Sequence, residues 1–568
     1  MKLLPTMSAV LFLLSISAGE PAVDRYGQYT GEEWPGKITS DDQLRAAAAK
    51  EWPEIRDAAF DPAKFDRFGG RLDAGTFEAT GRFYKKKIDG RWWLITPAGH
   101  RYFIIGCDAV GYNESGYASP LENPDGSKRK VFAELPDIGR VPDGISAGSP
   151  GSRKVNLLAA NLEKKYGPDY SAKSKEVNRK RLISWGFNST AKWGWGETFG
   201  LPYVEDTNFR SVKRLSNRRI DVYDPGFAAI AETNIMNLTL RLKNDPMLIA
   251  YATENENGLE YRDIRLLTAA APDIATKQAL VDFLIKRHGM EKATQLFGVT
   301  GGREAMLANR KEVELPAEDR GEFITATSRY YHRIVADLFK KYDPDHLWFG
   351  ASHCGTQSPE WIYAAAEFTD AVMLNEYDIT PIWSDALMPV LTKRDKPVFI
   401  TEFSFDGDRR GFRQYLPWNT MKDQAARGLA YRHYTERLAA NPLCIGFGYF
   451  IFFDQPVTRR SLPGGESFNF GLVNYTDQPY EDMIAEVKKS NARLEAVHAG
   501  QDTPFSLKDP RWLLGCWSKG WMTSLFLPGT TSECITVDTA NAAEYFGGCP
   551  VRLKIGAREV DGSQPKPW

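Results

Sequence analysis

Two glutamates follow apolar runs that the sequence predicts to be buried. Glu256 comes soon after Leu248–Thr253, and Glu402 comes directly after Pro397–Thr401. Two carboxyl groups held roughly 5–5.5 Å apart can hydrolyse a glycosidic bond with retention, because one protonates the leaving oxygen and the other attacks the anomeric carbon. Once one group ionises, the pKa of the other rises, which suits it to act as an acid. We therefore predict Glu256 as the acid/base and Glu402 as the nucleophile.

Three neighbouring glutamates are expected to do no chemistry. Glu254 has no asparagine before it and is expected to lie deeper, while Glu260 lies further out in the following loop. Glu376 belongs to the run Asn375-Glu376-Tyr377. Because successive side chains of a strand point to opposite faces, we expect Tyr377 to face inward and Glu376 to face away.

A parallel sheet is predicted to position these groups. Short apolar runs alternate with amphipathic helices, which is typical of βα units. The eight candidate strands are Tyr102–Asp108, Phe187–Trp193, Leu201–Glu205, Leu248–Thr253, Leu347–Ser352, Ala371–Asn375, Pro397–Thr401 and Cys444–Phe450. Eight such units predict an α/β fold of the (β/α)8 TIM-barrel type, in which catalytic residues lie at the carboxyl ends of the strands. A doubly wound sheet is disfavoured because no G-x-G-x-x-G follows the first strand.

Helices are predicted between most of these strands. The clearest are Phe227–Leu242, Arg320–Tyr342 and Met421–Ala440, and a final helix at Tyr480–His498 would close the barrel. The stretch 260–316 is longer than a simple βα connection. We expect it to form helices beside the face that carries the two glutamates.

Four parts are predicted along the chain. Residues 1–19 have the positive start, apolar run and small residues of a signal peptide, which predicts a secreted or periplasmic protein. Residues 20–80 form an N-terminal extension of helix and loop, and 81–500 form the barrel domain, opening with a hairpin that turns at Asp89-Gly90. Residues 501–568 are a strand-rich C-terminal extension. No segment is long and apolar enough to span a bilayer.

The charge balance and the cysteines argue against several kinds of partner. A net charge of -1 gives no attraction for nucleic acid or an anionic membrane surface. The 7 histidines form no H-x-H or H-E-x-x-H pattern and no CxxC occurs, so neither a metal site nor a cofactor is expected. The first three cysteines, Cys107, Cys354 and Cys444, are expected to be buried as small hydrophobes. One disulfide is plausible among the last three, Cys516, Cys534 and Cys549.

Several motifs give the chain a family resemblance. They are Gly90–His100 (GRWWLITPAGH), Trp185–Thr190 (WGFNST), Leu201-Pro202-Tyr203 and Asn469–Val473 (NFGLV), whose order and spacing cover about residues 80–500. With Asn255-Glu256 ending strand four and Glu402 ending strand seven, the chain resembles the clan of retaining (β/α)8 glycosidases. Within that clan it is most similar to the β-agarase and agarase-like families. The resemblance implies a polysaccharide or oligosaccharide substrate, agarose or porphyran above all, and no cofactor.

The resemblance also implies roles for individual residues. Asn255 would hydrogen-bond the sugar 2-hydroxyl, and Tyr377 would hold the carboxylate of Glu402. His353 would be a subsite donor, although a structural histidine is an equal alternative. Trp193 and Tyr449 would be platforms for sugar rings, with a core position as the alternative for each.

Three positions depart from the agarase pattern and bear on the substrate. The chain has Glu254 where relatives usually have Asp, Lys192 where they have Asn, and Tyr449 where they have Trp. Lys192 could pair with a sulfate or uronate group of the substrate, or with Glu197. A transglycosylase or an exo-β-glycosidase on another β-glycan would use the same carboxylates. An inactive carbohydrate-binding barrel is disfavoured because both carboxylates and Tyr377 are present.

Overall fold

The structure is a computed structural model of the 568-residue chain. The residues that it describes are 22–149, 151–193, 196–216, 219–354, 358–381, 387–407, 410–413, 415, 419–508, 510–513, 535–538, 552–555 and 558–560. The predicted signal peptide at 1–19 and the three C-terminal cysteines lie outside the described residues.

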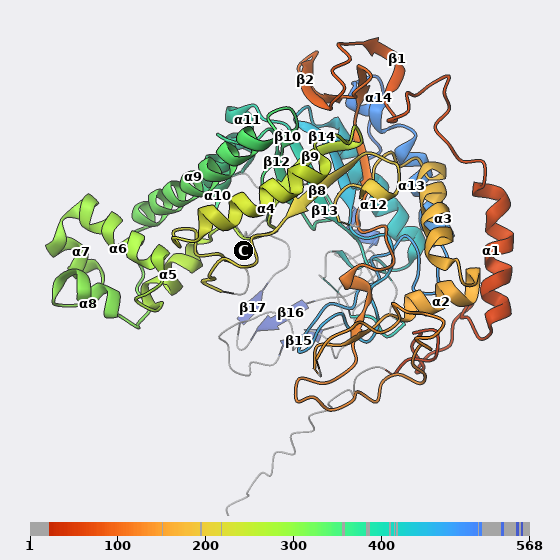
Figure 1. The fold of residues 1–568 in the computed structure, drawn as a ribbon, viewed down its shortest axis with the longest axis horizontal. Coiled ribbons are helices and arrows are strands. Elements are labelled where there is room, and N and C mark those ends of the chain that lie inside the picture. The colour runs from red at the N-terminus through yellow and green to blue at the C-terminus, as the bar shows by residue number, and fades with distance from the viewer. Residues whose placement is uncertain are drawn as a thin grey trace, which may run out of the picture.

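Parallel strands form the centre of the molecule (Figure 1). A five-stranded sheet has the order β11-β12-β13-β14-β5, and a three-stranded sheet has the order β10-β9-β8. Every neighbouring pair within these two sheets is parallel. Their bounds are β5 Ile104–Cys107, β8 Tyr203–Thr207, β9 Leu248–Thr253, β10 Leu347–Trp348, β11 Ser352–Cys354, β12 Val372–Asn375, β13 Val398–Phe403 and β14 Cys444–Tyr449.

Isolated bridges join the two sheets at their edges. Asn255, just after β9, forms a parallel bridge with Ser352 of β11. On the other side, Ser189 bridges Gly106 of β5, and Ala191 accepts a hydrogen bond from the amide of Val204 in β8. The predicted strand Phe187–Trp193 therefore lies between β5 and β8 without forming a regular strand. Positive φ angles at Ala191 and Trp193 interrupt its extended backbone.

The strands separate two apolar layers. Phe399, Met373 and Ile104 face inward and share one apolar cluster with the inward-facing residues of the three-stranded sheet. Val398 and Ile400 alternate with Phe399 and pack outward on the helices. The helices that follow the strands in the chain are α2 Leu157–Tyr166, α3 Tyr170–Ser184, α4 Phe227–Leu242, α9 Ala317–Tyr342, α10 Pro359–Ala365, α11 Leu387–Arg394, α12 Gln424–Ala440, α13 Glu481–Asn491 and α14 Leu494–His498.

The predicted helices are found close to their expected positions. Residues Phe227–Leu242 are helical as predicted, and the long helix begins at Ala317, three residues before the expected start. The insertion at 260–316 is helical, and Figure 1 shows its four helices gathered at one side of the molecule. These are α5 Tyr261–Ala269, α6 Ala275–His288, α7 Met290–Leu296 and α8 Gly302–Ala308.

An N-terminal layer precedes the parallel strands. Helix α1 spans Asp41–Ile55, and Ser40 immediately before it forms a capping box. An antiparallel sheet then follows in the order β1-β4-β3-β2, made of β1 Arg71–Thr76, β2 Tyr84–Ile88, β3 Arg91–Ile95 and β4 His100–Tyr102. The predicted hairpin is confirmed, because Asp89 and Gly90 turn between β2 and β3 with φ of 48° and 78°.

Three cysteines and three short C-terminal strands also bear on the predictions from the sequence. Cys107 and Cys444 are buried and Cys354 is half-buried, all three as free thiols. Three short antiparallel strands lie near the C-terminus, in the order β15-β16-β17 (Ile535–Asp538, Arg552–Ile555 and Arg558–Val560). Among the residues described, no helix combines the length and the apolar character that crossing a membrane needs.

Candidate active site

One amide connects the two predicted catalytic carboxyls. Asn375, the last residue of β12, donates from Nδ2 to Glu256 Oε1 at 3.0 Å and to Glu402 Oε1 at 2.9 Å. The same nitrogen lies 3.2 Å from Asn255 Oδ1. The side-chain oxygen Oδ1 of Asn375 accepts a hydrogen bond from the Thr401 hydroxyl at 2.6 Å. This bond fixes the orientation of the Asn375 amide. The ends of three strands therefore meet at this side chain.

Glu402 is enclosed by Tyr377 as well as by Asn375. The Tyr377 hydroxyl donates to Glu402 Oε2 at 2.8 Å, so each carboxylate oxygen has a donor. Burial, together with the charge of Glu256, raises the pKa of Glu402 to about 7, against the lowering effects of Lys192 and the Tyr377 hydrogen bond. Glu402 thus changes charge near neutral pH.

Lys192 brings a buried positive charge to the pair. Its Nζ donates to Ser352 Oγ at 2.7 Å and to Asn255 Oδ1 at 3.1 Å, and it lies 3.9 Å from Glu402 Oε1. The side chain is 1% exposed. The ammonium therefore faces the carboxylates, and Glu197 pairs instead with Arg241.

An irregularity in β13 aims Glu402 at the centre. The pairing of β13 shifts register against both neighbours between Ile400 and Phe403. Phe399 and Thr401 face inward by simple alternation, which would turn Glu402 outward and Phe403 inward. The extra residue of a bulge puts Glu402 beside Thr401 on the inner side and returns Phe403 to the outer layer.

Left-handed backbone gathers at the strand ends around these side chains. Five residues without the freedom of glycine have positive φ there: Ala109, Ala191, Trp193, Glu254 and Glu256, with φ between 44° and 58°. Each such residue costs of order 1–3 kcal/mol, and such backbone strain concentrates at functional sites. The loop after β9 changes direction at Glu254 and again at Glu256. The carboxyl groups of Glu254 and Glu256 therefore lie in different environments.

The three neighbouring glutamates take structural positions. Glu254 is buried and accepts the backbone N–H of Phe209 at 2.5 Å, so it lies deeper, as expected. Glu260 begins α5 and pairs with Arg219. Glu376 accepts from the Tyr434 hydroxyl of α12, on the helical side of the sheet.

Arg219 fixes the loop that carries Glu256. The Arg219 side chain is 5% exposed and pairs with Glu260 at 2.5 Å and with Asp263 at 2.7 Å. It also donates to the backbone carbonyl of Glu256. The start of α5 is thereby tied to the loop after β9, which holds the Glu256 main chain in place.

An aromatic wall lies beside the carboxylates. Trp193 is half-buried, with the Lys192 ammonium 4.0 Å from its ring centre and Phe450 at 5.6 Å, edge to face. Phe450 in turn contacts Phe470, which stacks on Tyr377. Trp193 is thus a half-buried ring next to a charged side chain, and a ring of this kind can stack on a sugar.

Two of the predicted sugar-binding residues are almost fully buried. Tyr449 is fully buried, packs on Phe403, and donates to the Phe470 carbonyl oxygen at 3.0 Å. The residues paired with Tyr449 on the neighbouring strands, Phe403 and Cys107, point outward. The next residue, Phe450, takes the inward direction and meets Trp193. His353 is 2% exposed and lies against His332 of α9, because Ser352 takes the inward position on β11. The structure thus places both in packing positions, which were the stated alternatives to sugar binding.

Asn375, Ser352 and Asp108 were not predicted as site residues. Asn375 has the same parity as Tyr377, so the alternation that selected Tyr377 could also have found it. Asp108 follows β5, is fully buried, and accepts the Lys192 N–H at 2.9 Å. Burial raises its pKa well above the ordinary aspartate value. A serine or an aspartate at a strand end is too common to signal a site by itself.

Known proteins resemble the chain over most of its length, although no family model matches it. β-Agarase B of Vibrio sp. (strain JT0107) is 26% identical over 525 residues, covering 83% of this chain and 54% of the relative. β-Agarase A of the same strain is 23% identical, covering 84% and 52%. The chain is a homologue of the β-agarases. It spans about half the length of these curated relatives.

Solved structures agree with this β-agarase-like assignment. An exo-β-agarase matches with a TM-score of 0.72 and 25% identity, covering 84% of this chain and 73% of that one. PfGH50B matches with a TM-score of 0.73 and 25% identity, covering 85% and 76%. The agarase AgWH50C matches with a TM-score of 0.71 and the same identity, covering 84% and 73%. The resemblance stated from the sequence motifs is therefore confirmed.

Proposed function

We propose that the protein is a glycoside hydrolase that cleaves β-glycosidic bonds of an agarose-type galactan with retention of configuration. The observation that carries the proposal is the shared contact of Glu256 and Glu402 with Asn375. Because one oxygen of each glutamate lies about 3 Å from the Asn375 amide nitrogen, these two oxygens are at most about 6 Å apart. That limit is nearer to the roughly 5–5.5 Å between the carboxyl groups of retaining enzymes than to the roughly 6.5–9.5 Å of inverting enzymes.

In this mechanism Glu402 attacks the anomeric carbon and Glu256 protonates the leaving oxygen. Glu256, now a carboxylate, then takes a proton from a water molecule, and that water releases the sugar from Glu402. The reaction needs one proton on the pair, with Glu402 ionised. Lys192 and the Tyr377 hydroxyl favour that charge on Glu402, while burial and Glu256 oppose it. Asn255 would hydrogen-bond the sugar 2-hydroxyl, and Trp193 would stack on a ring.

We also propose that the two parallel sheets form one (β/α)8 barrel. The Asn255–Ser352 and Gly106–Ser189 bridges and the Val204–Ala191 hydrogen bond supply pairing at each junction between the sheets. The strand ends would then surround Asn375, as in other barrels whose catalytic groups lie at that face. Residues 20–80 and 501–568 are proposed as extensions on either side of a barrel domain at 81–500.

The buried position of Lys192 bears on the substrate. Its ammonium is engaged by Ser352 and Asn255 and lies beside Glu402, so it does not offer a free positive charge to a sulfate or uronate group. This favours agarose, an uncharged galactan, over porphyran. The β-agarase relatives support the same choice. The apolar start of the chain supports a secreted or periplasmic location.

A digestion panel tests the proposal. Agarose, porphyran, carrageenan and plant β-glycans are incubated with the wild type, with Glu402→Ala and with Glu376→Gln, a matched control on a carboxyl that meets α12 instead. We expect oligosaccharides from agarose with the wild type and the control, and none with Glu402→Ala. The anomeric configuration of the first product, followed by NMR, should be that of the substrate.

The other outcomes separate the alternatives. Longer products formed in the presence of an added sugar acceptor would indicate a transglycosylase. Activity on another glycan alone would keep the mechanism and reject the galactan. Binding of galactan without hydrolysis by any of the three proteins would favour the inactive carbohydrate-binding barrel, and product of inverted configuration would reject the assignment of Glu402 as a nucleophile.

A further inference from the structure

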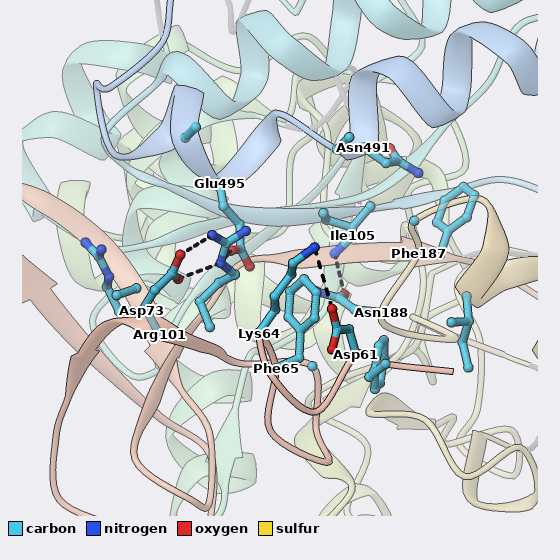
Figure 2. A pocket seen from close by; sticks show the side chains of 18 of the residues that line it. Asp61, Lys64, Phe65, Asp73, Arg101, Ile105, Phe187, Asn188, Asn491 and Glu495 are labelled. Atoms are coloured by element: carbon cyan, nitrogen blue, oxygen red, sulfur yellow. Dashed lines mark hydrogen bonds and ion pairs between the residues drawn. The ribbon is translucent and has the colours of Figure 1, made fainter. Parts of the chain in front are cut away.

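A cavity of about 370 Å³ lies at the opposite edge of the sheet from the catalytic pair (Figure 2). Strands β5, β14 and β13 are parallel neighbours. The cavity is lined by Arg101 of β4 and by Ile105 near the amino end of β5, whereas Glu402 is at the carboxyl end of β13. Other walls come from 59–74, from the turn after α3 and from α13–α14. Figure 1 places α14 near β1. The cavity is therefore separate from the proposed active site.

Charged side chains of both signs line the cavity wall, and most of them are paired. Three positive and three negative side chains line it: Lys64, Arg71 and Arg101, with Asp61, Asp73 and Glu495. Arg71 pairs with Asp73 at 2.6 Å and lies 3.8 Å from Glu495, and Lys64 lies 3.5 Å from Asp61. Burial raises the pKa of Glu495 to about 8, against the lowering effects of Arg71 and Arg101, so the two ion pairs leave at most one uncompensated charge in the wall. The wall therefore offers donors and acceptors to a hydroxyl-rich ligand and does not suit a multiply charged one.

Two aromatic rings stand beside these polar groups. Phe60 and Phe65 are half-buried, with ring centres 6.1 Å apart and planes inclined at 45°. The Arg71 guanidinium lies 5.4 Å from the centre of the Phe65 ring. In the same wall, Arg101 Nε is buried and has no acceptor among the described residues. Apolar ring faces next to unfilled donors are the combination that sugar rings meet through their C–H faces and hydroxyls.

We propose that this cavity is an accessory binding site for a neutral saccharide unit, at the end of the molecule away from catalysis. Its volume lies within the roughly 300–1,000 Å³ of small-molecule sites. The identity of the saccharide as an uncharged galactan rests on the proposed function. Such a site would hold the polysaccharide near the enzyme while another part of the glycan occupies the catalytic face, which raises the effective concentration of the substrate.

Calorimetric titration tests the site without catalysis. Glu402→Ala protein is titrated with neutral agarose oligosaccharides and with sulfated ones, alone and with Phe65→Ala or Ala59→Trp. Ala59 is exposed at the cavity, so a tryptophan there narrows the opening without removing a buried contact. The matched control is Phe77→Ala, a half-buried phenylalanine of the same extension outside the cavity lining.

We expect two classes of site for the neutral oligosaccharide. Either cavity variant should weaken one class at least about tenfold, the size of effect that a lost aromatic contact produces, and leave the other unchanged. The Phe77→Ala control should keep both. A single class of site in all proteins, or a second class that both cavity variants retain, would overturn the proposal.

The two proposals fail in distinguishable ways. If the wild type hydrolyses agarose but the titrations give one class of site, the accessory site is rejected and the proposed function stands. If no galactan is hydrolysed but a neutral saccharide still binds in a manner sensitive to Phe65 and Ala59, the site stands and the galactan assignment is rejected. Thermal unfolding of each variant establishes that lost binding is not lost folding.

Discussion

The Lys192 ammonium lies 3.9 Å from Glu402 Oε1, and the lysine and glutamate side chains are 1% and 7% exposed. A buried carboxylate is destabilised by desolvation, and a positive charge at this distance offsets part of that cost. Ser352 and Asn255 hold the ammonium by hydrogen bonds. The lysine is thereby positioned to affect the pH at which Glu402, the proposed nucleophile, ionises.

Replacing Lys192 by methionine should move the acidic limb of the pH profile of kcat/KM. Lys192 lowers the pKa of Glu402, which stands at about 7 with the lysine in place. Removal therefore raises that pKa, and the ionised nucleophile is lost at a higher pH than in the wild type. We expect the limb to move upward by about one unit and kcat/KM at pH 7 to fall about fivefold, because the ionised fraction of Glu402 falls from about one half to about one tenth.

Lys192→Arg is the matched control because it keeps the charge. Its acidic limb should stay close to that of the wild type, even if the fit against Ser352 is poorer and the rate falls at all pH values. An unmoved limb in Lys192→Met would show that Glu402 does not depend on this charge.

Asn375→Ala should weaken catalysis without unfolding the protein. The substitution removes one donor from each carboxyl, and a hydrogen bond to a charged group contributes about 1.5–3 kcal/mol. We expect kcat to fall about 10- to 1,000-fold. Steady-state kinetics on an agarose oligosaccharide, with circular dichroism as a check of folding, measures the effect.

Asn375→Asp gives a sharper version of the same test. A third carboxylate would raise the pKa of Glu402 by repulsion, so the rate loss should be larger than in Asn375→Ala and should shrink as the pH rises. Equal activity of the wild type and Asn375→Ala across the pH range would contradict the bridging role of this amide.

The principal site residues were accessible from the sequence because they follow strand position. Glu402 comes directly after an apolar run, Glu256 and Tyr377 come within three residues of one, and the strand ends of a parallel sheet meet at one edge. The bulge in β13 could not be foreseen, because it depends on how two neighbouring strands pair. Glu402 was assigned by its place after the strand, and simple alternation through Phe399 would have turned it outward.

The positions of Tyr449 and His353 depend on strand alternation, which the family resemblance does not supply. Tyr449 was chosen where relatives have Trp, but the inward residue is Phe450. His353 was chosen for its chemistry, although Ser352 beside it has the inward direction. Sequence patterns give the period of a strand more reliably than its phase, because the phase depends on the partners of each face.

The buried position of Tyr449 predicts an effect on stability rather than on catalysis. Its hydroxyl donates to Phe470 and accepts from Arg427 at 3.1 Å. Tyr449→Phe removes these bonds and leaves the ring, so it should lower the free energy of unfolding by about 1–3 kcal/mol. At a temperature where both proteins are folded, kcat/KM should stay within about twofold, since a buried ring away from the substrate makes no contact that changes in the transition state.

Trp193→Ala should behave in the opposite way. Its half-exposed ring is proposed to stack on a sugar, so KM should rise about tenfold with little change in the midpoint of urea unfolding. A large loss of kcat/KM in Tyr449→Phe beside a normal Trp193→Ala would restore Tyr449 as the sugar-binding residue.

Asp477 should be the acidic group whose loss most clearly destabilises the junction between α2, α3 and the loop before α13. Its carboxylate accepts from Lys165 Nζ at 2.8 Å and from Arg181, all three side chains being at most 1% exposed. Desolvation would raise the pKa of Asp477, but Arg181 and Lys165 outweigh it and lower the value to about 2. Asp477→Asn leaves both cations without this buried carboxylate, which should cost about 3–5 kcal/mol at pH 7.

The pH dependence of this difference follows from the sign of the shift. Because the pKa is lower in the folded protein than the roughly 3.9 of an unfolded aspartate, the ionised carboxylate stabilises the fold fully above pH 4 to 5. That stabilisation is lost as the pH falls towards 2, so the gap in unfolding free energy between the wild type and Asp477→Asn should narrow over this range. Urea unfolding at pH 7, 5 and 3 measures it, with Asp502→Asn as the control at an exposed ion pair with Arg493. A gap that stays constant from pH 7 to the lowest pH at which both proteins fold would mean that folding does not lower the pKa of Asp477.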